Sequence, residues 1–151
     1  MSVARLLLSG LLMSGVAAGS VWALARPASV EGDWVTEGGW ATVRIAGCRG
    51  EADRLCGLIV ALKQPNDRNG RPKRDTANLD PRKRDRAVVG MPFITGFRPA
   101  GAGRWTGGKI YNPGDGKTYA SRLALNPDGT LKVSGCVLVI CQAQTWTRAA
   151  S

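Results

Sequence analysis

The chain has 151 residues with 21 Lys and Arg, 11 Asp and Glu and no His, which gives a formal net charge of +10 at neutral pH. This length suffices for one domain that buries a genuine hydrophobic core. The lack of His excludes Ser-His-Asp and Cys-His catalysis and His-based metal sites. We expect no metal and no cofactor.

The first 25 residues have the composition of a cleavable export signal. Arg5 supplies a positive start, an apolar stretch begins at Leu6, and Ala23-Leu24-Ala25 places small residues at both positions that a signal peptidase reads. A transmembrane anchor is the alternative, but Gly and Ser interrupt the stretch, whereas a span needs about 20 predominantly apolar residues. We therefore expect residues 1–25 to be removed and residues 26–151 to form one domain in the periplasm or outside the cell, without a transmembrane anchor.

The rest of the chain is typical of an all-β protein. In the segment 41–45, Ala41, Val43 and Ile45 form an apolar face opposite Thr42 and Arg44, and such alternation belongs to antiparallel sheets with one covered face. Similar patterns predict eight strands, at residues 31–36, 40–46, 56–63, 92–98, 104–111, 117–125, 130–139 and 142–148.

Turn sequences separate several of these strands. Asn112-Pro113-Gly114 and Asn126-Pro127-Asp128-Gly129 combine Pro, which presets one dihedral angle, with Gly, which supplies positive φ. Sequential antiparallel strands are therefore the simplest topology. Closing about eight of them into a barrel removes the exposed edges and leaves an interior that can hold one small ligand.

Residues 64–91 do not fit the strand pattern and predict one long basic loop between the third and fourth strands. Asp80 as N-cap and Pro81 as first residue predict a helical turn at 80–84. Asp75, Asn78 and Asp80 could supply oxygen ligands to calcium, but their spacing is not that of an EF-hand, and turn capping is the favoured interpretation.

The four cysteines fit an exported protein. They allow three disulfide connectivities, and we favour the two local pairs, Cys48 with Cys56 and Cys136 with Cys141, because each pair flanks a predicted hairpin bend. Zinc is the alternative ligand, but these spacings do not match the usual short Cys knuckle.

The long loop is the most basic part of the chain. An anionic partner such as phospholipid headgroups is one interpretation, and a solvated loop that aids solubility is the other. No aromatic residue lies between Trp40 and Phe93, which argues against nucleic acid because its binders interleave aromatics for stacking. The residues predicted to contact an anionic surface are Arg71, Lys73, Arg74, Arg82, Lys83, Arg84 and Arg86.

The chain resembles a bacterial family of exported proteins known as domain of unknown function 2147 (DUF2147). The motifs that carry the resemblance are Gly32-Asp33-Trp34, Cys56-Gly57-Leu58-Ile59-Val60, Asn78-Leu79-Asp80-Pro81, Gly107-Gly108-Lys109-Ile110-Tyr111-Asn112-Pro113, Asp115-Gly116-Lys117-Thr118-Tyr119 and Gln144-Thr145-Trp146-Thr147-Arg148. The resemblance implies a lipocalin-like β-barrel, an envelope or secreted location and no assigned activity.

Two ends of the chain also resemble the lipocalin arrangement. Gly32 and Trp34 form a Gly-x-Trp motif on the first predicted strand, and Arg148 lies on the last. In lipocalins such an arginine lies across the tryptophan and closes one end of the barrel, an interaction worth about 0.5–2 kcal/mol. The alternative is two unrelated residues, Trp34 in the core and Arg148 on the surface.

These observations lead to ranked functional hypotheses. The first is a non-enzymatic exported binding protein that takes a small, largely apolar ligand in its barrel, with Lys109, Tyr111, Tyr119 and Arg122 as its polar groups. The second is an envelope protein that docks on anionic lipid or a protein through the basic loop. An enzyme comes third, because no catalytic constellation can be assembled from these residues.

Overall fold

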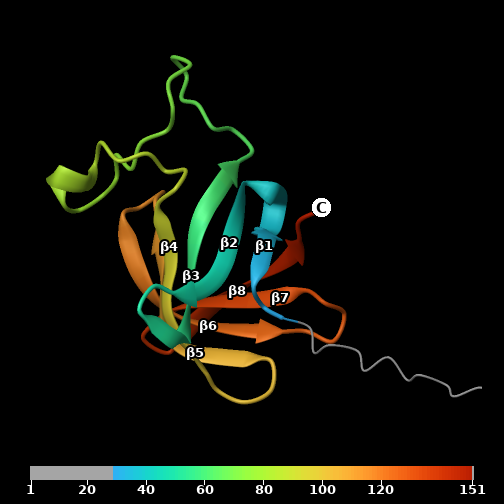
Figure 1. Ribbon diagram of the computed structural model, residues 1–151. Coiled ribbons are helices and arrows are strands. Elements are labelled where there is room, and N and C mark those ends of the chain that lie inside the picture. Colours follow the sequence, from blue (N-terminus) through green and yellow to red (C-terminus); the bar gives the residue numbers. More distant parts are fainter. Residues whose placement is uncertain (1–28, 151) are drawn as a thin grey trace, which may run out of the picture.

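The computed structural model describes residues 29–150, so the predicted export signal at residues 1–25 and the predicted domain boundary after residue 25 both lie outside the described residues. Eight antiparallel strands form a closed barrel in chain order, with β1 paired to β8 (Figure 1). The strands are β1 (Gly32–Val35), β2 (Ala41–Cys48), β3 (Glu51–Leu62), β4 (Pro92–Pro99), β5 (Arg104–Asn112), β6 (Lys117–Leu125), β7 (Leu131–Val137) and β8 (Ile140–Arg148). Two short 3₁₀ helices, η1 (Glu37–Gly39) and η2 (Pro81–Lys83), lie in the connections.

The predicted fold class is therefore confirmed, with differences at strand ends. The β2–β3 hairpin continues beyond the predicted strands and turns at Arg49 and Gly50. The last hairpin turns at Leu138 and Val139, although these residues were expected to end a strand. In each hairpin a disulfide joins the two strands beside the turn.

The two local disulfides form as predicted. Cys48 and Cys56 have Cα atoms 4.9 Å apart, and Cys136 and Cys141 have Cα atoms 4.0 Å apart. Cys136 and Cys141 are direct cross-strand partners on β7 and β8. Two disulfides are compatible with an exported protein. Among residues 29–150, no helix has the length and apolar character to cross a membrane.

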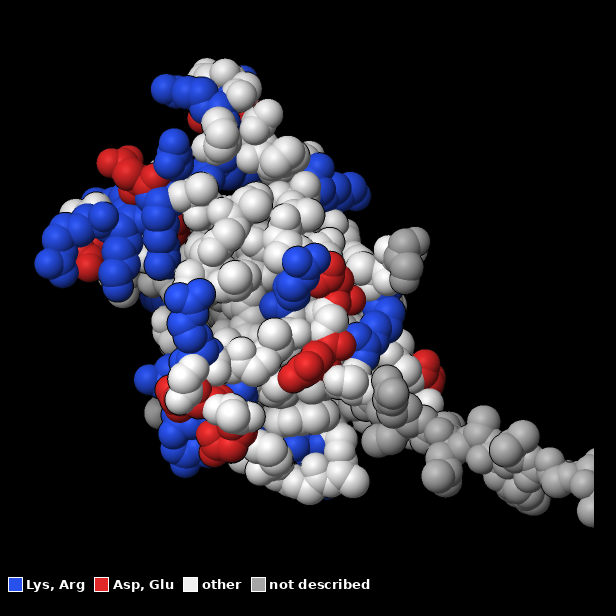
Figure 2. Space-filling model, viewed as in Figure 1, with Lys and Arg blue, Asp and Glu red and all other residues white. Residues whose placement is uncertain are grey.

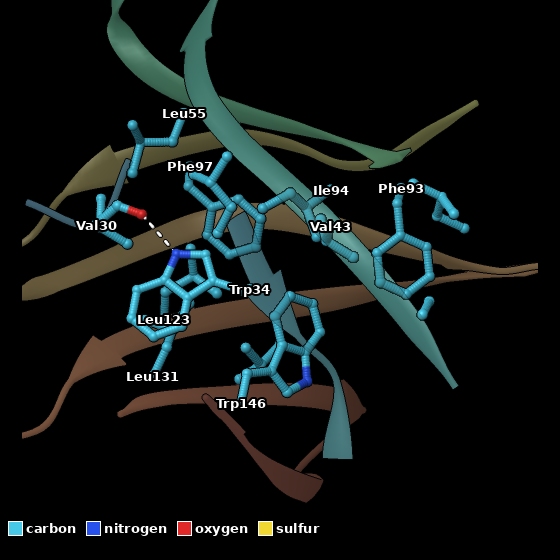
Figure 3. Close-up of a cluster of buried hydrophobic side chains, with 14 of the residues drawn as sticks. Val30, Trp34, Val43, Leu55, Phe93, Ile94, Phe97, Leu123, Leu131 and Trp146 are labelled. Atoms are coloured by element: carbon cyan, nitrogen blue, oxygen red, sulfur yellow. Dashed lines mark hydrogen bonds between the residues drawn. The ribbon is translucent and has the colours of Figure 1, made fainter. Parts of the chain in front are cut away.

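The barrel has two different ends. We call the end that carries the β1–β2, β3–β4, β5–β6 and β7–β8 connections the open end, and the opposite end the closed end. The closed half is packed around Trp34, whose indole Nε1 donates a hydrogen bond of 2.8 Å to the carbonyl oxygen of Val30 (Figure 3). Phe97, Ile94 and Leu123 fill the same region and are almost fully buried.

The β3–β4 connection extends from the open end as a long excursion (Figure 1). It contains η2, where the Asp80 carboxylate accepts a hydrogen bond from the backbone N–H of Arg82, and Pro81 is the first helical residue. The predicted helical turn thus forms as a single 3₁₀ turn. No regular strand forms between Leu62 and Pro92, since only isolated β-bridges join Asn66 to Pro72 and Arg74 to Ala87.

Candidate ligand-binding site

The open half of the barrel contains a cavity of about 820 Å³. Its apolar floor is built on Phe93, which stacks on the buried Trp146 with ring centroids 6.0 Å apart. Trp40 meets Phe93 edge-on at 5.6 Å and lies at the rim. Ile110 and Val133 complete the apolar part of the lining. The interior of this barrel is therefore filled at one end and hollow at the other.

The last two strands explain why the cavity exists. On β8, Trp146 is fully buried, and Gln142 and Gln144 share its face because side chains alternate along a strand. The Gln144 side chain accepts a hydrogen bond of 3.0 Å from the Trp146 indole, yet both glutamines are exposed to the cavity. Opposite Gln142 on β7 stands Gly135, which contributes no side chain to the interior. Small and polar residues thus replace the bulky core residues of the other strands.

A buried polar network at the rim holds the β3–β4 connection against the barrel. Asp75 is fully buried and accepts hydrogen bonds from the Tyr111 hydroxyl at 2.6 Å and from the Asn78 amide at 2.6 Å. It also pairs with Arg86 at 2.8 Å, and the Arg86 guanidinium lies 5.1 Å from the centre of the Tyr111 ring. Since Tyr111 belongs to β5 and lines the cavity, this network fixes one side of its rim.

A second tyrosine–aspartate pair lies nearby at the rim. The Tyr119 hydroxyl on β6 donates a hydrogen bond to Asp115 in the β5–β6 turn. This hydrogen bond, with burial, raises the pKa of Tyr119, and burial together with the bond to Asp75 raises the pKa of Tyr111. Burial alone would raise the pKa of Asp115, but the hydrogen bonds from Tyr119 and the Lys117 backbone hold it below its ordinary value. At neutral pH both phenols are protonated, and each hydroxyl proton is committed to a carboxylate.

The structure brings only two of the four predicted ligand-binding residues to the cavity. Tyr111 and Tyr119 line it, whereas Lys109 and Arg122 are exposed on the outer surface of the barrel. Arg122 points outward because side chains alternate along a strand and its two neighbours, Ser121 and Leu123, face inward. Lys109 is adjacent to the cavity-lining Ile110 and points the other way.

Sequence reasoning missed Gly135, Gln142 and Gln144, because a strand with polar residues on both faces gives no alternation to read. It also missed the partners of Asp75. Of the residues considered above as calcium ligands, Asp75 accepts hydrogen bonds from Tyr111, Arg86 and the Asn78 amide. The Asn78 side-chain oxygen accepts one from the backbone N–H of Asp80, and Asp80 caps η2.

The closed end has the arrangement of indole and guanidinium that the Gly-x-Trp motif predicts. Arg148 pairs with Trp34 across β8 and β1, and its guanidinium carbon lies 4.1 Å from the centre of the indole. The same guanidinium donates a hydrogen bond of 2.7 Å to the carbonyl oxygen of Glu31. Gly32 has φ of +123°, and a Cβ there would lie 2.7 Å from an Arg148 nitrogen, so glycine gives the arginine room to reach over Trp34.

The basic residues gather on the β3–β4 connection, as the blue side chains over this segment show (Figure 2). Four of them are paired with carboxylates within the segment: Arg71 with Asp67, Arg82 and Lys83 with Asp80, and Arg86 with Asp75. Two others donate to carbonyl oxygens, Arg74 to Asp85 at 2.6 Å and Arg84 to Asn78 at 2.8 Å.

The segment remains strongly positive at its surface in spite of these pairs, because its basic residues outnumber its acidic ones. The Arg82 side chain is 89% exposed, and exposed ion pairs are weak and exchange readily with other partners. Lys73 and Arg74 line a groove of about 750 Å³ between this segment and the barrel, and the groove adjoins the cavity, since Trp40 and Asn112 line both.

Comparisons with known proteins agree with this architecture. A family model described as "Uncharacterized protein conserved in bacteria (DUF2147)" matches residues 32–148. Among solved structures, protein HP1028 from the human pathogen Helicobacter pylori, described as belonging to the lipocalin family, is similar with a TM-score of 0.70 and 23% sequence identity, covering 82% of this chain and 84% of that one. No curated protein matches the chain. At this identity the likeness to the lipocalin concerns the fold.

Proposed function

Since the chain belongs to the DUF2147 family, which is described only as uncharacterized, we propose its function from the barrel: it binds a small, largely apolar ligand in the cavity at the open end. The observation that carries the proposal is the cavity of about 820 Å³ over an aromatic floor. This volume lies within the range of small-molecule sites, about 300–1,000 Å³, which are apolar with a few placed polar groups. Gln142, Gln144 and the two rim tyrosines supply those polar groups.

We propose that the protein does this outside the cytoplasm and without catalysis. Both disulfides support an oxidising compartment, as does the predicted export signal at residues 1–25. The chain has no His, and its four cysteines are bound in disulfides, which removes the commonest nucleophiles and general bases.

Filling the cavity from within tests the proposal. Gly135 faces the interior without positive φ, and a Cβ there would meet Ile110 and Tyr119 at 3.6 and 3.8 Å, which is ordinary contact. Gly135→Phe should therefore fold and place its ring in the cavity. We expect it to weaken binding of the fluorescent apolar probe N-phenyl-1-naphthylamine at least about tenfold, a loss of 1.4 kcal/mol or more.

Thr95→Phe is the matched control, because Thr95 is exposed on β4 beside the inward-facing Ile94. This variant should bind the probe like the parent protein. Native mass spectrometry of protein purified from its own host should also show an adduct that organic extraction removes. Equal probe binding by Gly135→Phe and Thr95→Phe, without an adduct, would refute a ligand site in the barrel.

A second proposal is favoured by the exposed positive surface of the β3–β4 connection: the protein docks on an anionic surface of the cell envelope. Each Lys or Arg near an anionic membrane contributes about 1 kcal/mol. Arg82→Ala with Arg84→Ala should therefore weaken binding to vesicles that contain phosphatidylglycerol at least about tenfold. The control, Arg104→Ala with Lys132→Ala, removes the same charge from the outer wall, where both residues border a different groove, and should leave binding unchanged.

A further inference from the structure

The tip of the β7–β8 hairpin is an exposed apolar surface. It consists of Val137, Leu138, Val139 and Ile140, which are 58, 95, 93 and 73% exposed. Four consecutive apolar side chains in water contribute nothing to the core, and no polar side chain interrupts them. Scattered exposed apolar residues are normal, but a contiguous group of them marks an interaction surface.

The backbone of the tip adds a second observation. Leu138 has φ of +54° and is the one residue other than glycine with positive φ among residues 29–150. Two-residue hairpin turns with positive φ at the first central position favour Gly there, because a Cβ is disfavoured in this region. Folding alone would select Gly and a polar residue at positions 138 and 139. The chain instead holds Leu and Val at the turn, with the Cys136–Cys141 disulfide at its base.

The tip of the β7–β8 hairpin lies at the open end of the barrel. Val137 and Ile140 line the cavity, so the tip stands at its rim. Other exposed large apolar side chains lie in connections at the open end as well: Trp40 after η1, and Leu79 and Val89 between β3 and β4. The basic β3–β4 connection leaves the barrel at this same end. Apolar protrusions and positive charge are therefore combined on one face.

We propose that the β7–β8 tip inserts its apolar side chains into the surface of a lipid bilayer that contains anionic phospholipid, so that the cavity opens toward the membrane. Charge complementarity favours lipid as the occupant, since basic side chains that flank an apolar insertion suit anionic headgroups around acyl chains. The disulfide and the two-residue turn hold the tip in place before it binds, so little conformational freedom is lost on insertion. The inference rests on the proposed docking at the envelope and adds the element that enters the bilayer.

Vesicle flotation tests the insertion with Leu138→Gly combined with Val139→Ser. This change removes two exposed apolar side chains and gives the turn the residue that its backbone favours, so the variant should melt at the same or a higher temperature. We expect the parent protein to float with phosphatidylcholine vesicles that contain phosphatidylglycerol, and to keep part of this binding at high salt. The variant should bind at least about tenfold more weakly and lose its remaining binding at high salt.

Leu58→Ser is the matched control, because Leu58 is 44% exposed on the outer wall of β3, and its vesicle binding should equal that of the parent. Both the tip variant and the control should bind N-phenyl-1-naphthylamine normally. If the parent protein floats and the tip variant floats equally well, insertion of the tip is refuted while docking through the basic segment stands. If the parent does not float at all, both docking proposals are refuted and the ligand site is untouched.

Discussion

Asp75→Ala is expected to lower the free energy of unfolding by about 3 kcal/mol, because removing one partner of a buried charged network leaves the others without compensation. The Asp75 carboxylate receives hydrogen bonds from Tyr111, Asn78 and Arg86 and is completely buried. Its loss strands a buried amide and a hydroxyl and leaves Arg86 without its carboxylate. We take the lower part of the 3–5 kcal/mol range for such changes since the Arg86 side chain is 32% exposed and can regain water.

Urea denaturation followed by far-ultraviolet circular dichroism measures this loss. Asp80→Ala serves as control, because Asp80 pairs with Arg82 and Lys83 and caps η2 on the surface of the same connection, and such a pair or cap contributes only about 1 kcal/mol. Comparable losses in the two variants would mean that the Asp75 network does not anchor the segment.

The same substitution should also affect the cavity. Tyr111 lines the rim and is tied through Asp75 to a connection with no regular strand of its own. Without that tie, the segment loses its fixed position beside the rim. We therefore expect Asp75→Ala to weaken binding of N-phenyl-1-naphthylamine even at temperatures where the barrel remains folded, whereas Asp80→Ala should not.

The barrel could be predicted because the sequence patterns that specify it, alternation within strands and turn sequences between them, each lie within a few consecutive residues. Alternation at Ala41, Val43 and Ile45 fixes which face of β2 is covered, and all three side chains are buried. Turns such as that at Asn126-Pro127-Asp128-Gly129 fix where strands end: Asn126 receives a backbone hydrogen bond from Gly129, and the chain reverses between β6 and β7. When each strand pairs with the next one in the sequence, the first and last strands are left with unpaired N–H and C=O groups. Pairing these two strands with each other closes the barrel and removes both edges.

The candidate site could not be predicted in the same way, because its parts are distant in the sequence or defined by what is missing. The hydrogen bond between Tyr111 and Asp75 joins residues 36 positions apart, one of them in a segment without periodicity. The cavity depends on Gly135 and two glutamines on inward-facing positions, where a pattern of apolar residues would have indicated a filled core. Lys109 and Arg122 were predicted because they carry charge on neighbouring strands, but both side chains lie on the outer face of the sheet.

Gly108→Ala should destabilise the protein by about 3 kcal/mol, the upper end of the range for inserting atoms into a packed core. Gly108 lies at an irregular step in the β5–β6 ladder, and a Cβ there would fall 2.3 Å from ring atoms of Phe97. Phe97 is fully buried beside Trp34 in the closed half, so its ring cannot move aside without displacing its neighbours. Thermal and urea unfolding of the purified variant give the measured difference.

The adjacent glycine separates crowding from backbone effects. Gly107 has φ of +70° but nothing within 4 Å of a new Cβ, so Gly107→Ala should lose only about 1 kcal/mol, the penalty of a left-handed backbone for alanine. Shortening the opposing ring provides the converse test: in the double variant Gly108→Ala with Phe97→Leu, the two losses should not add, with a coupling of at least about 1 kcal/mol. Strictly additive losses would show that Gly108 is not needed for the close approach of Phe97, and that the packing of the closed half does not depend on a bare backbone at this step of β5.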